Sequence, residues 1–310
     1  MVFECRLFSS ICFSLAKIFI YFVMCSLDMK KRLDLWEGAI LSVIVFGLLG
    51  VFLPGKGMDD LVLALLSVSS FLFGIFVAFS IADRHSRQKE MRETMRVSDA
   101  YVINLYHLSK VMSKDVQKKI HKHLDEWLVA TMDYFLKDHH KSDPLFSKLY
   151  MYILSIKPKK GKQSLVYEEM IPLLFSQVES NKRVRYLSQD KITVAEWSSI
   201  LILTGIILFC LFYINTNSIF SIFLVTLLAT TLVTILLVLR DLDALYWKEQ
   251  KWIWDPVSAL FQEIGSLPYF PQDVIDNKRI KLKKGLKYRG ATYPKPYPDL
   301  TGKKVKIRVA

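Results

Sequence analysis

The sequence predicts an all-α integral membrane protein with four core transmembrane helices in two hairpins and a cytoplasmic helical bundle. Apolar residues make up 52% of its 310 residues, and the mean hydropathy of +0.27 is high for an ordinary soluble domain. These residues are concentrated in blocks without charge at 38–55, 61–82 and 197–239. A bilayer core about 30 Å thick needs about 20 apolar helical residues. The blocks 38–55 and 61–82 therefore predict one span each. The block 197–239 predicts two spans, divided at Asn215–Ser218.

The first 28 residues leave three interpretations open. The run Leu7–Leu27 is apolar apart from Lys17, so residues 1–28 form an extra span, an uncleaved signal-like leader, or a segment before a later start codon at Met24 or Met29. The residues before Cys25 are not the small ones that a cleavage site needs. The fold prediction does not depend on this segment.

The basic flanks of the spans predict their orientation, because Lys and Arg are retained on the cytoplasmic side. These flanks are Lys30–Arg32 before the first span, Arg84, Arg87, Lys89 and Arg92 after the second, Lys182, Arg183, Arg185 and Lys191 before the third, and Arg240, Lys248 and Lys251 after the fourth. We expect a multi-pass protein of the plasma (inner) membrane with transmembrane hairpins at 36–83 and 194–240. Residues 84–193 and the C-terminus are then cytoplasmic.

The cytoplasmic connection, residues 84–193, is expected to be helical throughout. The chain has no Gly or Pro from Ile75 to Met112, so the second span should continue as one rod about 75 Å long at 1.5 Å per residue. Ser113 is placed to cap a second helix, and Asp143-Pro144 to open a third. A fourth helix starts near Ser164 and leads toward the third span, with Pro172 in its first half.

The C-terminal part divides into an amphipathic cytoplasmic segment, 241–277, and a basic tail, 278–310. Tyr246, Trp247, Trp252 and Trp254 suit a position at the lipid headgroups. The tail has 12 Lys and Arg residues against one acid, Asp299, and Tyr293–Pro298 favours an extended, solvated chain. We expect the tail to bind anionic membrane lipid. We do not expect nucleic acid as a partner, because the membrane explains the same charge.

The sequence lacks the motifs of common catalytic sites. No phosphate-binding glycine loop, nucleophile elbow or zinc-protease motif occurs, so we expect no enzyme and no cofactor. Cys5, Cys12, Cys25 and Cys210 form no C-x-x-C pair, and the His121/His123 and His139-His140 pairs fit a solvated basic helix surface, so no metal site is expected either. The four spans contain no internal ionisable residue, which argues against carboxylate-driven transport.

The second span has an ordered surface. At 100° per residue, seven residues fall within about 100° of one another: Ala64, Ser67, Phe71, Gly74, Ile75, Ala78 and Ala82. We call them the stripe of the second span. Small residues let helices approach closely, so the stripe is an ordinary packing face in one interpretation. In the other, copies of the helix surround an axis, small residues keep a pore open, and Phe71 and Ile75 form a hydrophobic constriction.

A family resemblance rests on short motifs. The stretch Ser70–Val77, continued by a basic helix from Arg84, resembles the second transmembrane helix of bestrophins. The arrangement over residues 36–265 is similar to the bestrophin-like family of bacterial membrane proteins. Further similar segments are Ser98–Tyr101 with Leu105-Tyr106, and Leu236–Leu239 with Arg240–Asp243.

The resemblance implies a homo-oligomer, pentameric in bestrophins, whose second helices line a central ion pathway and whose cytoplasmic helices form a vestibule. Carried over by position, the bestrophin constriction falls on Ser67, Phe71 and Ile75. Ser67 departs from the pattern because a hydroxyl replaces an apolar residue. The dense acidic calcium-binding cluster of animal bestrophins is also missing after the fourth span, where only Asp241, Asp243 and Glu249 occur, so calcium gating is not expected.

Two functions remain open at this stage. The first is an oligomeric ion channel with a hydrophobic constriction on the second span. The alternative is a non-conducting membrane scaffold or sensor that recruits partners through its cytoplasmic helices, with the stripe of the second span serving only to pack helices.

Overall fold

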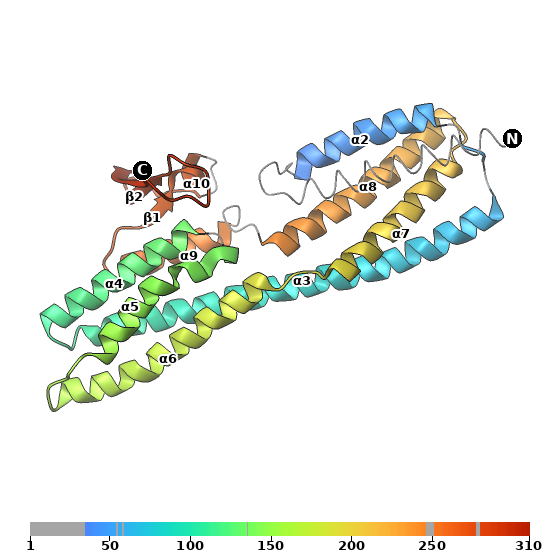
Figure 1. Cartoon of the computed structure of the whole chain (residues 1–310). Helices are drawn as coiled ribbons and strands as arrows, with labels where there is room; N and C mark the ends of the chain where they lie inside the picture. Colours follow the sequence, from blue (N-terminus) through green and yellow to red (C-terminus); the bar gives the residue numbers. More distant parts are fainter. Residues whose placement is uncertain (1–34, 54, 58, 135, 246–250, 277–279) are drawn as a thin grey trace. The chain divides into compact units, whose positions relative to one another are not determined.

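The structure is a computed structural model that describes residues 35–53, 55–57, 59–134, 136–245, 251–276 and 280–310 (Figure 1). The elements run in the order α2 (Leu35–Phe52), α3 (Asp60–Ser109), α4 (Lys114–Asp133), a 3-10 helix η1 (Leu136–Ser142), α5 (Asp143–Leu154), α6 (Lys162–Gln189), α7 (Val194–Tyr213), α8 (Ile219–Ala244), α9 (Lys251–Glu263), β1 (Tyr269–Pro271), α10 (Gln272–Asp276), β2 (Lys287–Thr292) and β3 (Lys304–Val309). The leader at 1–28 lies outside the described residues.

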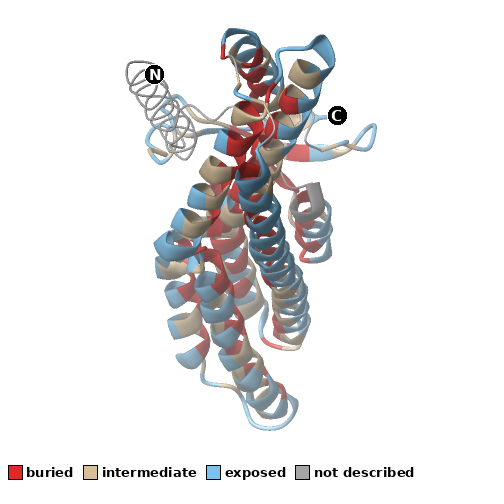
Figure 2. Cartoon of the chain, turned by 90° about the vertical axis from the view of Figure 1, so that its right-hand side faces the viewer, coloured by how far each residue is buried: buried red, intermediate tan, exposed pale blue. Residues whose placement is uncertain are grey.

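Four helices of the described chain, α2, α3, α7 and α8, are long and apolar enough to cross a membrane. They coincide with the four expected spans. The chain itself buries only 22% of the apolar window of α2 and of α3, and exposed residues run along the helices (Figure 2). Lipid or another subunit must therefore cover the rest, since water would leave a large apolar surface exposed.

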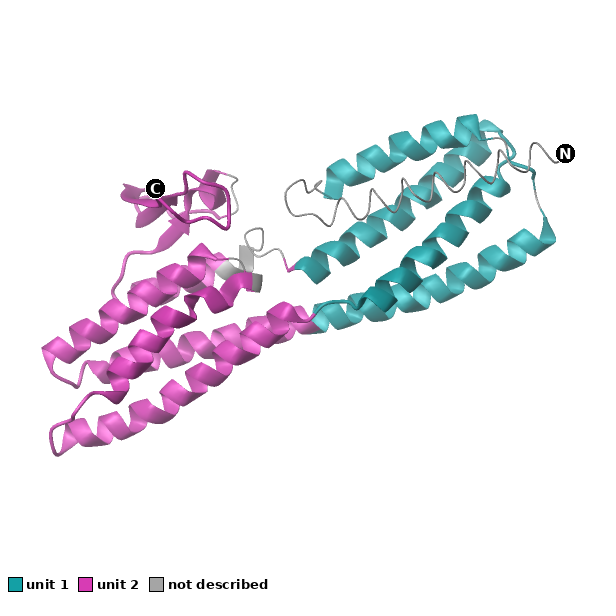
Figure 3. Ribbon diagram, viewed as in Figure 1, with its two compact units in different colours: residues 1–86, 191–244 teal, residues 87–190, 245–310 magenta. Residues whose placement is uncertain are grey.

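The chain forms two compact units (Figure 3). Unit 1 comprises residues 1–86 and 191–244, and unit 2 comprises residues 87–190 and 245–310. Because α3 is one helix from Asp60 to Ser109, residues 60–86 of it belong to unit 1 and residues 87–109 to unit 2. The expected continuation of the second span as a single rod is confirmed.

Unit 1 is a bundle of the four apolar helices, with α2 packed along α8. Its core contains Phe46, Phe73, Val77, Ile207, Leu211, Val233 and Leu237. Two glycines of α2 allow the close approach: a Cβ atom at Gly38 would lie 2.6 Å from Cδ1 of Leu237, and one at Gly50 would lie 3.2 Å from Cγ2 of Ile222. Small residues at such a contact let two membrane helices pack backbone to backbone.

The loops that follow α2 and α7 interlock at one end of unit 1. Asn215 is fully buried, and its amide Nδ2 donates a hydrogen bond to the carbonyl of Gly50 at 2.8 Å. The backbone N–H of Lys56 donates to the carbonyl of Tyr213 at 2.8 Å. Gly55 lies so close to this turn that a Cβ atom there would be 2.7 Å from the Tyr213 carbonyl oxygen. The uncharged turn expected at Asn215–Ser218 is thus part of a packed junction.

Unit 2 is a helical bundle closed by a small sheet. Ser113 caps α4 as expected, its Oγ accepting a hydrogen bond from the N–H of Val116 at 3.4 Å. The α4 side chains Ile120, Leu124, Trp127 and Leu128 are buried in a core shared with α3, α5, α6 and α9. Pro172 lies inside α6, which runs without interruption from Lys162 to Gln189.

The expectation of an extended, solvated tail over residues 278–310 is wrong. In the described chain, β2 pairs in parallel with β1 and antiparallel with β3, giving the order β1-β2-β3. Tyr288 and Ala291 of β2 are buried. The tail folds because its strands find a short third strand and a helical surface on which to pack.

Acidic residues of α4 hold this sheet. Arg289 makes two bonds of 2.7 Å to the carboxylate of Asp125. The buried carboxylate of Asp133 accepts hydrogen bonds from Tyr269 and from Tyr293, the latter at 2.7 Å, and pairs with Lys303. Burial, and then the charge of Asp133, raise the pKa of both tyrosines. Part of the tail's positive charge is therefore neutralised within the chain.

Two aromatic or basic groups expected at a surface are buried. Trp254 is fully buried in the core of unit 2 instead of lying at the headgroups, while Tyr246, Trp247 and the side chain of Trp252 are outside the described residues. His139, expected on a solvated helix face, is buried in η1. Its burial, with His140 and Arg185 nearby, lowers its pKa to about 4, so the ring is neutral at physiological pH.

Candidate functional site

All seven residues of the stripe of the second span, called the α3 stripe from here on, are exposed on a single face of α3. Val62, Ser69, Phe73 and Val77 of the same helix are buried in unit 1. At 100° per residue these buried positions are centred about 160° from the stripe. The structure therefore places the stripe on the side of α3 that points away from its own bundle.

The stripe makes few contacts inside the chain. Phe71 is 69% exposed and Ile75 is 38% exposed. Among the described residues, no heavy atom of a neighbouring side chain or helix lies within 4 Å of a Cβ atom built at Gly74. The hydroxyl of Ser67 donates to the carbonyl of Leu63, four residues earlier, at 2.9 Å. Packing within the subunit thus does not account for the small residues here.

A charged cluster closes unit 1 next to the last residues of the second span. The guanidinium of Arg84 is buried, and it pairs with Asp83 and, at 3.5 Å, with Asp243. The same Asp243 oxygen accepts the backbone N–H of Ile192 at 2.9 Å. One carboxylate therefore ties the end of α8 both to α3 and to the residues that lead into α7.

The expectations for Arg84 concerned the orientation of the spans and a basic helix that starts there, and they did not include this pairing. A signal was present, since Arg84 follows the second span directly and Asp241 and Asp243 follow the fourth. Spans in two hairpins of one orientation end at the same side, so opposite charges at both ends predict a contact. Asp241 pairs with the buried Arg240 at 2.8 Å, so both carboxylates are engaged by arginines.

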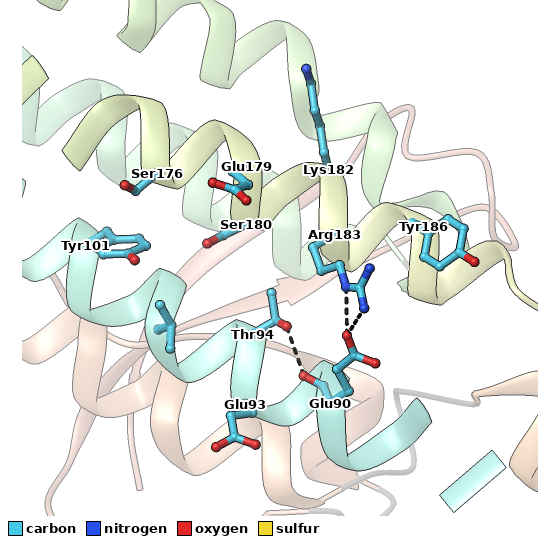
Figure 4. A pocket seen from close by; sticks show the side chains of 11 residues that line it. Glu90, Glu93, Thr94, Tyr101, Ser176, Glu179, Ser180, Lys182, Arg183 and Tyr186 are labelled. Atoms are coloured by element: carbon cyan, nitrogen blue, oxygen red, sulfur yellow. Dashed lines mark hydrogen bonds and ion pairs between the residues drawn. The ribbon is translucent and has the colours of Figure 1, made fainter. Parts of the chain in front are cut away.

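Unit 2 has an open groove of about 660 Å³ between α3 and α6. Figure 4 shows Arg183 of α6 reaching Glu90 of α3, with Nε donating to the carboxylate at 2.7 Å. Deeper in the same seam, the amide of Gln177 donates to Oγ of Ser98 at 2.7 Å. The groove also contains Glu93, Glu179 and Lys182. These polar contacts fix the spacing of α3 and α6 in the bundle.

Comparison with known families decides what kind of protein carries this geometry. Residues 39–246 match the family model described as "Bestrophin-like domain". The chain belongs to the bestrophin-like family. The match covers most of the segment, residues 36–265, over which the sequence motifs resemble that family.

The fold of this bestrophin-like protein is also similar to a solved structure. That structure is described as the crystal structure of a membrane protein, in a form with a single glycine-to-alanine substitution, and it matches with a TM-score of 0.59 at 11% sequence identity. The alignment covers 75% of this chain and 99% of the other. At this identity the likeness concerns the fold alone. No curated protein sequence matches the chain.

The bestrophin-like protein is thus an all-α membrane protein over the matched region, with α2, α3, α7 and α8 as its membrane-spanning helices. The match ends at residue 246. The elements β1, α10, β2 and β3, from Tyr269 to Val309, lie beyond it. The small sheet is therefore a feature of this chain that the family model does not describe.

Proposed function

We propose that the protein is an oligomeric ion channel of the plasma (inner) membrane, in which the α3 helices of several subunits line a central pathway. The residues facing the pathway are those of the α3 stripe. The assembly is a homo-oligomer, a pentamer by the resemblance to bestrophins, and the helices of residues 84–193 face the cytoplasm. Membership of the bestrophin-like family supports the class.

One observation carries the proposal: the α3 stripe is turned away from the bundle that α3 helps to form. A helix surface that faces only lipid gains nothing from Gly74, Ala78 or Ala82, because lipid tails fill space around large and small side chains alike. The neighbouring exposed side chains Leu61, Leu65, Leu72 and Phe79 are large and apolar, as expected for lipid or subunit contact. Small residues gathered on one open face suit a water-filled axis.

The constriction is assigned to Ser67, Phe71 and Ile75. Exposed rings and branched side chains repeated around an axis form a narrow apolar zone that excludes water when closed, which is gating by dewetting. Ser67 makes one end of this zone more polar, although its hydroxyl proton is already used by the Leu63 carbonyl. Phe71 is the largest side chain of the stripe and is expected to set the minimum width.

The test is conductance of the purified full chain in planar bilayers, combined with its native mass. The wild-type protein should conduct, and Phe71→Ala should raise the single-channel conductance about tenfold or abolish closure, because the apolar zone is widened. Phe79→Ala is the matched control: Phe79 is on the same helix and 74% exposed, but it lies outside the stripe. Its conductance should equal that of the wild type.

One outcome would contradict the channel, and two would contradict the constriction assigned to the α3 stripe. A silent wild-type protein with a monomeric mass would favour the scaffold or sensor, in which the cytoplasmic helices recruit partners. Equal changes in Phe71→Ala and Phe79→Ala would show that the stripe has no special role. A conducting oligomer unaffected by Phe71→Ala would move the constriction elsewhere.

A further inference from the structure

Strand β3 forms an open edge of the C-terminal sheet. The sheet has the order β1-β2-β3 in the described chain, so β3 pairs with β2 on one side only. Val305, Ile307 and Val309 are 46%, 68% and 61% exposed. Exposed edge strands with apolar residues are templates for pairing with another strand. This edge lies beyond the part of the chain that the family model matches.

The two faces of β3 have different chemistry. Successive side chains of a strand point to opposite faces, so Val305, Ile307 and Val309 share one face while Lys304, Lys306 and Arg308 share the other. In the antiparallel register, Ile307 lies opposite Arg289 and Lys306 lies opposite Gly290. No acidic partner is found for the three β3 cations within the described chain.

The backbone groups of the apolar residues point to the open edge. The N–H of Ala310 donates to the carbonyl of Leu286 at 3.0 Å, so the even-numbered residues of this strand bond toward β2. Bonding alternates along an antiparallel pair. The N–H and C=O groups of Val305, Ile307 and Val309 are therefore directed away from β2, where another extended chain can bond to them.

The positive charges of β3 determine which kind of partner can bind at this edge. A second copy of β3 would place a row of cations against a row of cations, which is destabilising. A flat bilayer can touch the apolar face or the cationic face, but not both. An extended segment paired along the edge contacts both faces at once, with apolar residues on one and acidic residues on the other.

We infer that β3 is a docking site for an extended segment of another protein in which apolar and acidic residues alternate. The segment adds a fourth strand to the sheet. Main-chain hydrogen bonds to Val305, Ile307 and Val309 supply affinity, and pairing of its carboxylates with Lys304, Lys306 and Arg308 supplies specificity. This inference does not depend on the proposed channel function.

The test uses the full chain in detergent and a fluorescein-labelled synthetic peptide of alternating valine and glutamate, measured by fluorescence anisotropy. The wild-type protein should bind this peptide and should bind a valine–lysine peptide about tenfold or more weakly. Ile307→Pro should weaken binding by about tenfold or more, since proline removes an N–H at the open edge but none of the bonds to β2.

A second variant tests the same edge in case the proline variant misfolds. Lys306→Glu combined with Arg308→Glu leaves the backbone unchanged and should weaken binding of the valine–glutamate peptide by about tenfold or more. Lys160→Glu changes an exposed charge in the α5–α6 loop and should leave binding unchanged. The inference is overturned if the peptide does not bind, if both β3 variants bind as the wild type does, or if only phosphatidylserine vesicles bind in a flotation assay.

Discussion

Helices α2 and α3 each carry a row of small residues, and the two rows have different surroundings. On α2, Gly38, Ser42 and Gly50 are buried, and Leu237 and Ile222 of α8 fill the space beside the glycines. On α3, Gly74 faces open space within the described chain, and the rest of the stripe is exposed. The same residue pattern therefore marks a contact made inside the subunit in one helix and a surface left for something else in the other.

The comparison shows what a small-residue pattern says by itself. It predicts close approach of a backbone to a neighbour, but it does not say whether that neighbour belongs to the same chain, to another copy, or is water. The nature of the neighbour is decided by which face of the helix is buried in its own subunit. Because Phe73 and Val77 are buried opposite the stripe, the partner of the α3 stripe lies outside the subunit.

The largest loss of stability is expected when a glycine packed against other backbone atoms is substituted, in contrast to a glycine with no neighbouring atoms. Gly55→Ala would place a Cβ atom 2.7 Å from the carbonyl oxygen of Tyr213 and 2.8 Å from the backbone nitrogen of Asn215, and backbone atoms cannot move aside cheaply. We expect a loss of about 3 kcal/mol in the free energy of unfolding, measured by thermal denaturation in detergent. Gly74→Ala should leave the melting temperature of the monomer within error. Equal losses in both variants would show that Gly74 is packed within the chain.

A smaller loss of stability is expected when a polar side chain that bonds to another element is removed. Removing one that bonds only within its own helix should cost less. Asn215→Ala removes the hydrogen bond to the Gly50 carbonyl and leaves that buried acceptor without this donor, which costs about 1–2 kcal/mol. Ser67→Ala removes a hydroxyl that bonds only within α3, and its stability should match that of the wild type. A stable Asn215→Ala variant would show that the loop junction does not hold unit 1 together.

A further effect should appear as a pH dependence in unit 2. Asp125 is paired with Arg289, whereas burial raises the pKa of Asp99 from 3.8 to about 7. The folded state then binds a proton more tightly than the unfolded state, so stability falls as pH rises from about 4 to 7 and stays low above it. Asp99→Asn should melt at a higher temperature than the wild type at pH 8, with the difference vanishing near pH 4. A constant difference at every pH would rule out this titration.

The sequence predicts the helices of unit 1 well because each membrane span is encoded by a short continuous stretch of residues. A block without charge, such as Leu61–Ala82, has a length fixed by the bilayer, and Thr193 and Glu196 form the capping box that begins α7. The positions of the α3 stripe also follow from helix period alone. The period does not reveal which face of α3 is buried, because that depends on α7 and α8.

The sheet was missed for a different reason. Lys304–Val309 alternates cations with branched apolar residues, which is typical of a strand, but an alternating run of six residues cannot form a sheet without a partner. Its stability comes from pairing with β2 and from Asp125 and Asp133 on α4, more than 150 residues away in the chain. Charge counted over the tail alone therefore predicted a solvated segment.

The shared carboxylate of Asp243 limits how unit 1 can move. It accepts both the Arg84 guanidinium and the Ile192 backbone N–H, so the middle of α3, the end of α8 and the residues before α7 meet at one oxygen. Sliding α3 along its axis by a single turn, about 5.4 Å, would separate a buried cation from this anion. Motions that keep the pair together, such as tilting the whole four-helix unit as a rigid body, avoid that cost.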